Sequence, residues 1–338
     1  MTEQAKGSAL SPTEISERLE QALFEIRRVI AGQDAMLERV LVCLLAQGHL
    51  LIEGVPGLAK TLTIKTTAGV LGGTFARVQF TPDLVPADLV GTRIYRPDQG
   101  TFDTELGPVF CNFLLADEIN RAPAKVQSAL LEVMQEHQVT IAHTSYPVPS
   151  PFLVMATQNP IESEGTYPLP EAQVDRFMLK ILIDYPVHDE ELTIVQRQLV
   201  PHPELREALS LDQLRALQAA VFDVYVDPSL ISYAVDLATA TREPARVGLG
   251  QLASFISFGA SPRGPISVVQ AARALALLRG RDYVTGDDLR ALAKDALRHR
   301  LVLSYEALAE SMSPDRILDA VLAAVPVPDV SLARPASA

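Results

Sequence analysis

The residues Gly54–Thr61 read GVPGLAKT, which has the spacing of a phosphate-binding loop with one departure. The usual pattern is G-x-x-x-x-G-K-[ST], and Ala59 stands where the second glycine is expected. In such a loop, backbone N–H groups surround a polyphosphate, the lysine reaches the β- and γ-phosphates, and the hydroxyl binds Mg²⁺. Lys60 and Thr61 are therefore candidate ligands for phosphate and metal. The alternative is a plain strand–turn–helix connection.

The alanine before the lysine leads to a prediction about the backbone. A Cβ atom penalises the left-handed region, so Ala59 fits the loop only if its φ is negative and near-helical. Gly57 would then take the tight turn, where a glycine tolerates positive φ. The residues expected to contact the nucleotide in this stretch are Gly54, Val55, Pro56, Gly57, Leu58, Ala59, Lys60, Thr61 and Leu62.

Two adjacent acids follow the apolar run in FLLADEIN. A buried strand ending in Asp117 and Glu118 would place them at the carboxyl edge of the sheet, where α/β proteins bind ligands. Asp117 would hold Mg²⁺ directly or through water, and Glu118 would polarise an attacking water. Two solvated acids at a strand end are the alternative, which a phosphate loop upstream in the same domain disfavours.

Three further polar residues follow later in the chain. Asn159 ends the run LVMATQNP, and its amide can hydrogen-bond a γ-phosphate or the water, although Asn-Pro is also a good turn former. Arg176 stands just before another apolar run, where a surface ion pair with Asp175 is an equal alternative. Arg263 lies in SPRGP at the start of a helix, and on its own it reads as a solvated first-turn arginine.

The hydrophobic pattern predicts the strands and helices that would position these residues. From Thr13 to about Tyr185, short apolar runs alternate with helical segments, which is the pattern of a parallel sheet covered by helices. Near-continuous hydrophobicity within the runs fits strands that are buried on both faces. The predicted strands are Leu50–Glu53, Ala76–Phe80, Phe113–Ala116, Phe152–Ala156 and Met178–Ile183.

After Pro186 the pattern changes to amphipathic helices with apolar residues three and four positions apart. The predicted helices are Glu190–Val200, Leu211–Val221, Pro228–Thr241, Ile266–Leu278 and Asp287–His299. Four parts are expected: a flexible start (1–12), an α/β core (13–186), a helical domain (187–325) and a flexible tail (326–338). Gly100–Phe110 and Gln138–Phe152 are predicted to be hairpins inserted into the core.

Composition excludes several classes of protein. Over 338 residues, 48% are hydrophobic and 21% charged, as in ordinary globular proteins. A net charge of −12 argues against a general nucleic-acid surface. Cys43 and Cys111 make no disulfide framework or metal site and are predicted to be core residues. Met1–Pro12 lacks the apolar region of a secretory signal, and the longest apolar run, Val40–Ala46, is too short for a membrane span. We therefore expect a cytoplasmic location.

In this order, over a sheet domain followed by a helical one, the motifs resemble the AAA+ ATPases and, more closely, the MoxR family. The resemblance runs from about Val29 to about Leu303 and so covers most of the chain. It implies a P-loop AAA+ core, a parallel-sheet α/β/α domain, followed by a small all-α lid domain. The stretches that carry it are GVPGLAKT, LLADEINRAPAKVQSALLEVMQE, QVTI, ATQNPIESEGTYPLPEAQVDRFMLK and SPRGPISVVQAARALALLRGRDYVTGDDL.

The resemblance assigns roles to the core residues. Gly54–Thr61 looks like the Walker A loop, in which MoxR proteins commonly carry alanine before the lysine. Asp117 and Glu118 look like Walker B, and Asn159 looks like sensor 1. The two inserted hairpins look like the helix-2 insert and the pre-sensor-1 hairpin of this AAA+ branch.

The resemblance also assigns residues outside the phosphate loop. Arg176 looks like the arginine finger that acts in trans on the nucleotide of the neighbouring subunit. Arg263 looks like sensor 2, supplied in cis by the lid, and Ile30 and Gly32 would lie near the adenine. The pair Gly264-Pro265 departs from the family's pattern and is expected to weaken or re-aim the first turn of the lid helix.

The activity implied is hydrolysis of ATP with Mg²⁺ by a homo-oligomer, expected to be a hexameric ring, that remodels client protein complexes. A partner with a von Willebrand A domain would be a separate chain, because the D-x-S-x-S motif of that domain is absent. One alternative is a nucleic-acid motor of the helicase type, against which the acidic charge and the lack of a zinc or winged-helix module count. The other is a nucleotide-gated scaffold without hydrolysis, which Glu118, Asn159 and Arg176 together disfavour. Neither a stable nucleic-acid complex nor a membrane segment is expected.

Overall fold

The computed structural model describes residues 12–55, 60–159, 165–200 and 203–329. Its centre is a five-stranded parallel sheet with the strand order β2–β5–β8–β1–β9. Every predicted core strand is confirmed to within two residues at each end. The strands are β1 (Leu50–Gly54), β2 (Phe75–Gln79), β5 (Phe113–Asp117), β8 (Leu153–Gln158) and β9 (Leu179–Ile183).

Alternate residues of the central strands enter two separate hydrophobic cores. In β1, Leu50 and Ile52 belong to one core, whereas Leu51 belongs to the other. Successive side chains of a strand point to opposite faces, so both faces of the sheet are covered. One face packs on α1 (Pro12–Val29), α2 (Asp34–Leu45) and α3 (Lys60–Val70), and the other on α4 (Pro86–Val90) and α5 (Ala124–Glu136).

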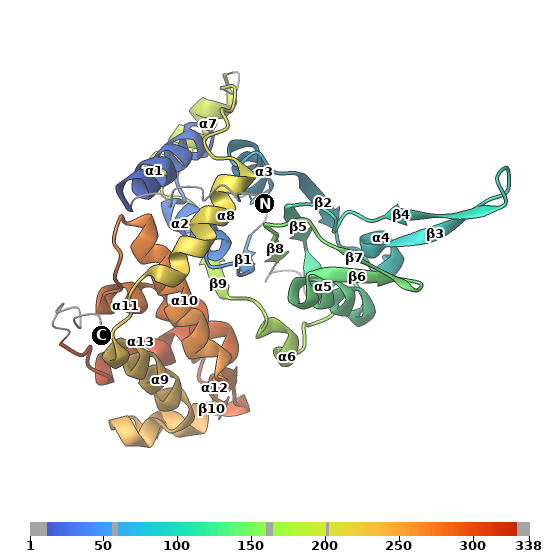
Figure 1. The fold of residues 1–338 in the computed structure, drawn as a ribbon. Helices are drawn as coiled ribbons and strands as arrows, with labels where there is room; N and C mark the ends of the chain where they lie inside the picture. The colour runs from blue at the N-terminus through green and yellow to red at the C-terminus, as the bar shows by residue number, and fades with distance from the viewer. Residues whose placement is uncertain (1–11, 56–59, 160–164, 201–202, 330–338) are drawn as a thin grey trace, which may run out of the picture.

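Two antiparallel hairpins extend from this core. One joins β6 (Gln138–Ile141) to β7 (Thr144–Pro147) and confirms the second predicted insert. The other joins β3 (Gly91–Arg96) to β4 (Thr101–Leu106) and projects far from the sheet (Figure 1). The predicted range for this hairpin began at Gly100 and therefore missed its first strand. A long two-stranded arm with no sheet beneath it lacks the apolar alternation from which the core strands were predicted.

Helices dominate the chain after β9, and the five predicted there are confirmed with small shifts of their ends. In the described part of the chain after β9, the sequence-based prediction missed the last two helices, four short 3-10 helices and a two-stranded pairing of β10 with β11. The C-terminal helices and strands are α7 (His188–Gln198), α8 (Leu211–Ala220), α9 (Pro228–Arg242), β10 (Ile256–Phe258), α10 (Arg263–Leu278), α11 (Gly286–Leu297), β11 (Val302–Leu303), α12 (Tyr305–Ala309) and α13 (Pro314–Ala324). The 3-10 helices are η1 (Ile119–Arg121), η2 (Val221–Asp223), η3 (Pro244–Val247), η4 (Gly250–Phe255) and η5 (Arg298–Arg300).

The pair Gly264-Pro265 does not prevent α10 from beginning at Arg263, and the hydrogen bond from the Ile266 N–H to the Pro262 carbonyl in its first turn is 3.4 Å long. The helix begins at Arg263, and Pro265 falls in the first turn, where backbone N–H groups have no intrahelical partner in any case. A Cβ added at Gly264 would lie 2.8 Å from Leu297 Cδ2 of α11. The glycine therefore allows α10 and α11 to pack closely.

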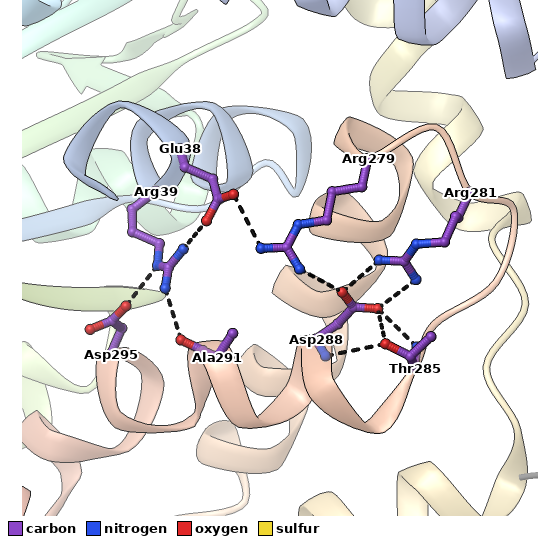
Figure 2. Close-up of polar contacts among 8 residues, drawn as sticks. All are labelled: Glu38, Arg39, Arg279, Arg281, Thr285, Asp288, Ala291 and Asp295. Atoms are coloured by element: carbon purple, nitrogen blue, oxygen red, sulfur yellow. Dashed lines mark hydrogen bonds and ion pairs between the residues drawn. The ribbon is translucent and has the colours of Figure 1, made fainter. Parts of the chain in front are cut away.

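A network of ion pairs joins α2 to the helices α10 and α11 (Figure 2). Arg39 of α2 donates to Asp295 Oδ2 at 2.7 Å and to the carbonyl of Ala291 at 2.8 Å. The carboxylate of Glu38 bridges Arg39 and Arg279, with 3.3 Å to the Arg279 guanidinium. The amphipathic helices thus bind the core through charges as well as apolar contacts.

The start of α11 completes this network. Asp288 is fully buried and accepts hydrogen bonds from Arg279 and Arg281, at 3.1 and 2.7 Å. It also accepts from the N–H and hydroxyl of Thr285, the residue that caps the helix.

The helices of the described residues were also compared with the length and hydropathy of a membrane span, and none of them meets both requirements.

Candidate active site

The phosphate-loop candidate joins β1 to α3 at the carboxyl edge of the sheet. Gly54 ends β1, and its carbonyl accepts a hydrogen bond of 2.7 Å from Lys60 Nζ at the start of α3. A Cβ at Gly54 would lie 2.5 Å from the backbone oxygen of Ile183 in β9, so this position requires glycine. Residues 56–59 lie outside the described residues, so the conformations expected for Gly57 and Ala59 remain predictions, as do contacts of Pro56 and Leu58.

Lys60 lies among acidic groups. Burial lowers the pKa of its ammonium group, and the nearby carboxylates of Asp117, Glu118 and Glu53 oppose that shift. An ammonium group placed beside these carboxylates at the start of a helix can bind a phosphate. Thr61 follows it at the helix start and is partly buried.

Asp117 ends β5 and is held by two donors. Its Oδ1 accepts from the Thr157 hydroxyl at 2.6 Å, and its Oδ2 accepts from Arg77 Nη2 at 2.7 Å. The Thr157 oxygen in turn accepts from the backbone N–H of Glu118 at 2.8 Å. One buried hydroxyl thus sets the relative positions of both acids. The Arg77 side chain is 47% exposed, so it can move away when a cation binds Asp117.

Glu118 has a left-handed backbone, with φ of 57° and ψ of 49°. Non-glycine residues adopt this region at a cost, and such residues cluster at functional sites. Its Oε2 accepts from Gln79 Nε2 at 2.9 Å and pairs with Arg121 Nε at 3.1 Å. Gln79 is itself oriented, because its amide oxygen accepts from Arg77. The carboxylate of Glu118 is therefore fixed in position by β2 and η1.

Asn159 follows the end of β8 and is 9% exposed. Strand β8 lies between β5 and β1 in the sheet, so Asn159 comes between the acids of β5 and the loop after β1. Because the carboxyl ends of parallel strands meet at one edge, the sheet brings together Lys60, Asp117, Glu118 and Asn159, as the sequence predicted.

Ile30 and Gly32 line a separate pocket of about 360 Å³ between the end of α1 and α7. Its volume is in the range of small-ligand clefts. Arg197 of α7 closes the side of this pocket by donating to the carbonyl oxygens of Arg27 and Ile30, at 2.7 and 3.1 Å. Gly32 has φ of 67°, and a Cβ there would lie 3.1 Å from Glu190 Cδ. The pocket is lined by both residues that were expected near the adenine.

Comparison with known proteins identifies the family to which the chain belongs. The family described as "ATPase family associated with various cellular activities (AAA)" matches residues 49–179, and the AAA lid domain matches residues 252–321. The chaperone MoxR1 of Mycobacterium tuberculosis is 56% identical over 93% of this chain and 83% of its own length. The MoxR protein of Paracoccus denitrificans is 34% identical over 92% of this chain and 96% of its own length. The chain belongs to the MoxR family of AAA+ ATPases.

A solved structure shares the fold as well. It comes from Cytophaga hutchinsonii and is described as a candidate ATPase. Its TM-score is 0.89 and its identity 46%, with 94% of this chain and 97% of that chain covered. The α/β core with a helical lid that MoxR membership implied is therefore confirmed.

The two arginines that the MoxR resemblance singled out lie away from Lys60. Arg176 and Arg263 line one pocket of about 260 Å³ together with Gly48 and His49, which precede β1. Lys60 follows the other end of β1, and five residues at about 3.3 Å each separate the two edges by about 16 Å. In this arrangement Arg263 lies near the start of β1 and away from Lys60, so its expected action in cis stays a prediction that this placement does not support.

The surroundings of Arg176 differ from the simple alternative of a surface ion pair. Arg176 Nη1 donates to the carbonyl of Leu131 in α5 at 2.9 Å. Its neighbour Asp175 instead pairs with Arg300 of the lid at 2.7 Å. Arg263 Nη1 lies 3.9 Å from the other oxygen of Asp175. Arg300 and Arg263 thus lie near the Asp175 carboxylate at the amino edge of the sheet, whereas the Arg176 side chain bonds to α5.

Sequence reasoning missed three residues of the MoxR site: Arg77, Gln79 and Thr157. A pattern was available for the first two, because Arg77 and Gln79 alternate along a predicted strand and so share one face. The parallel register then places Gln79 opposite Asp117. Thr157 precedes Asn159 by two residues, but only the pairing of β8 beside β5 shows which groups its hydroxyl bridges.

Proposed function

We propose that this chain hydrolyses ATP with Mg²⁺ in a homo-oligomeric ring, expected to be hexameric, and uses the energy to remodel client protein complexes. The observation that carries the proposal is the meeting of Lys60, Asp117, Glu118 and Asn159 at one edge of the sheet. A site that only bound nucleotide would have no need of an oriented carboxylate such as that of Glu118.

The side chains present fit a magnesium nucleotide. Mg²⁺ prefers oxygen ligands, and it is commonly held by one or two carboxylates together with phosphates and waters. Asp117 provides a carboxylate and Thr61 a hydroxyl, and Lys60 provides a cation for the phosphates. The metal, when bound, would neutralise charge that develops on the phosphate oxygens.

The protein's own residues would position the reactants, since phosphoryl transfer depends on positioning and charge stabilisation more than on covalent chemistry. Glu118 would orient the attacking water and Asn159 would hydrogen-bond the water or the γ-phosphate. Lys60 would hold the β- and γ-phosphates. Ile30 and Gly32 would contact the base in the pocket beside α7.

Arg176 would complete the site in trans. It lies at the amino edge of the sheet, opposite its own phosphate loop, and a head-to-tail ring presents that edge to a neighbouring subunit. Arg263 shares this location, so we propose that it also faces the neighbour's nucleotide. The proposed units are the core (13–186) and the lid (187–325).

The remodelling role rests on the relatives. One of them is named as a chaperone, and we propose a comparable role here, with a separate von Willebrand A domain protein as partner. A nucleic-acid motor is not favoured by a net charge of −12.

Replacing Glu118 by Gln tests the proposal. We expect Glu118→Gln to bind ATP with unchanged affinity and to lose turnover by about 100-fold or more, because the amide cannot act as a base. Fluorescent-nucleotide titration and phosphate release measure the two quantities. Glu243→Gln, on an exposed carboxylate of the lid, is the matched control and should keep full activity. Full turnover in Glu118→Gln would overturn the assignment.

A further inference from the structure

Arg300 of the lid is hydrogen-bonded to residues 175–178, which we call the finger segment. Its Nε donates to Asp175 Oδ1 at 2.7 Å. Its Nη2 donates to the carbonyl oxygens of Phe177 and Asp175, at 2.8 and 3.1 Å. Its Nη1 donates to the carbonyl of Met178 at 3.2 Å. These acceptors belong to residues on both sides of Arg176, the residue of the segment that is proposed to act in trans.

The remaining hydrogen bonds of Arg300 anchor it within the lid. Nη2 also donates to Ser267 Oγ of α10 at 3.1 Å, and Nη1 donates to the carbonyl of Ala296. The side chain is 2% exposed, and burial lowers the pKa of its guanidinium, which the Asp175 carboxylate opposes. A buried guanidinium requires partners for its fixed fork of five N–H groups. An ammonium group cannot reproduce this planar arrangement.

The two residues before Arg300 also form contacts with the finger segment and with the start of β9. His299 Nε2 lies 3.0 Å from the carbonyl oxygen of Phe177, and Arg298 Nη1 donates to the carbonyl of Lys180 at 2.6 Å. The lid thus holds the backbone of the finger segment and the start of β9 through three consecutive side chains. The lid therefore contacts the backbone on both sides of Arg176.

The lid is also linked to the pocket lined by Ile30 and Gly32 in the same chain, which we call the base pocket because it is proposed to hold the nucleotide base. Helix α11 runs directly into η5, which contains Arg300. In Figure 2, α11 is tied to α2 by Arg39, which bonds Asp295 and Ala291. Helix α2 begins two residues after Gly32, which lines the pocket.

We propose that Arg300 is a positioning residue for the finger Arg176. It fixes the finger segment to the lid, so that the lid, which is tied to the base pocket of one subunit, sets the position of the arginine offered to the next subunit. This inference rests on the proposed trans hydrolysis. It adds the residue that couples the nucleotide state of one subunit to catalysis in its neighbour.

Mixing two defective variants distinguishes positioning of a trans finger from support of the chain's own site. Arg300→Lys keeps the charge but loses the fork, so alone it should bind nucleotide normally and hydrolyse at least 10-fold more slowly. Glu118→Gln has an intact finger but no base. At equal amounts, random mixing in a head-to-tail ring places a competent site beside an intact finger at about one quarter of the interfaces. Activity should then rise several-fold above the sum of the two variants alone.

One control variant and one substitute variant complete this test. Arg246→Lys changes a lid arginine outside this connection, which pairs with the exposed Glu243, and it should retain full turnover. Asp175→Asn replaces the charged acceptor of Arg300 by a neutral amide and is the substitute if Arg300→Lys does not fold. It should show the same recovery on mixing.

The outcomes separate the inference from the proposed function. A fully active Arg300→Lys overturns the inference. So does failure to recover with Glu118→Gln while an Arg176→Ala plus Glu118→Gln mixture does recover. If the Arg176→Ala mixture also fails to recover, the trans mechanism itself is wrong and the inference falls with it.

Discussion

At the scale of single residues, the two acids after β5 show how a site is oriented by groups that carry no chemistry of their own. Asp117 and Glu118 are adjacent in the chain, yet they need different surroundings for their proposed roles as metal ligand and base. The Thr157 hydroxyl donates to the first and accepts from the backbone N–H of the second. Arg77 and Gln79 contact the outer oxygens of the two carboxylates.

Removing the Thr157 hydroxyl should therefore weaken metal use without disrupting the fold. We expect Thr157→Val to raise the Mg²⁺ concentration for half-maximal ATPase activity, or to lower turnover, by about 10- to 100-fold, as for other residues that orient metal ligands. The isosteric valine leaves no cavity. Magnesium titrations of the steady-state rate measure the effect. Thr157→Ser keeps the hydroxyl and should stay within a few-fold of the unchanged chain; equal loss in both variants would contradict this role.

At the scale of secondary-structure elements, α2 and α11 are joined by charges that are largely removed from solvent. The side chains of Arg39 and Asp295 are 12% and 15% exposed. Because partly buried charged groups lose solvation, leaving one of them without its partner is costly. By contrast, the ion pair of Arg246 and Glu243 in η3 is exposed at both ends, at 66% and 57%.

These two arginines should differ in their effect on stability. Arg39→Met should lower the free energy of unfolding by about 2 kcal/mol, since hydrogen bonds to charged groups are lost inside the interface. Arg246→Met should change it by less than about 0.5 kcal/mol, as is usual for exposed pairs. Urea unfolding followed by circular dichroism gives both values. Similar small losses in the two variants would show that the α2–α11 network contributes little.

At the scale of the whole molecule, the two edges of the sheet carry complementary halves of the proposed site. The carboxyl edge holds Lys60, Asp117, Glu118 and Asn159, and the amino edge holds Arg176 beside the lid. A single chain therefore has both halves but cannot bring them together across the length of β1. The proposed ring supplies the missing contact.

Hydrolysis should consequently depend on assembly. The rate per subunit should fall on dilution below the assembly midpoint, whereas nucleotide affinity should stay nearly constant. Arg176→Ala should bind ATP normally and lose about 10³-fold or more in turnover, the range found for arginine fingers. Phosphate release at several protein concentrations, alongside sedimentation, checks both expectations. A monomeric species with full activity would remove the trans role.

Much of the core was predictable from the sequence because the determinants are local. The strands ending at Gly54, Asp117 and Gln158 are nearly continuous apolar runs, and parallel strands place their carboxyl ends at one edge. The β3–β4 arm was only half predicted, because its first strand alternates little between apolar and polar residues. Helices α12 and α13 were missed although Ser304 and Ser313 cap them.

By itself, the sequence predicted which residues would carry the proposed chemistry, and it predicted that Lys60, Asp117, Glu118 and Asn159 would lie at one edge of the sheet. Only the tertiary structure decided where Arg263 lies, because the lid docks through contacts between residues far apart in the chain. The pairing of Asp175 with Arg300 spans 125 positions, and no local pattern of spacing specifies such a contact. Residue types thus define the possible chemistry, whereas packing of the lid against the sheet decides at which edge of the sheet each arginine lies.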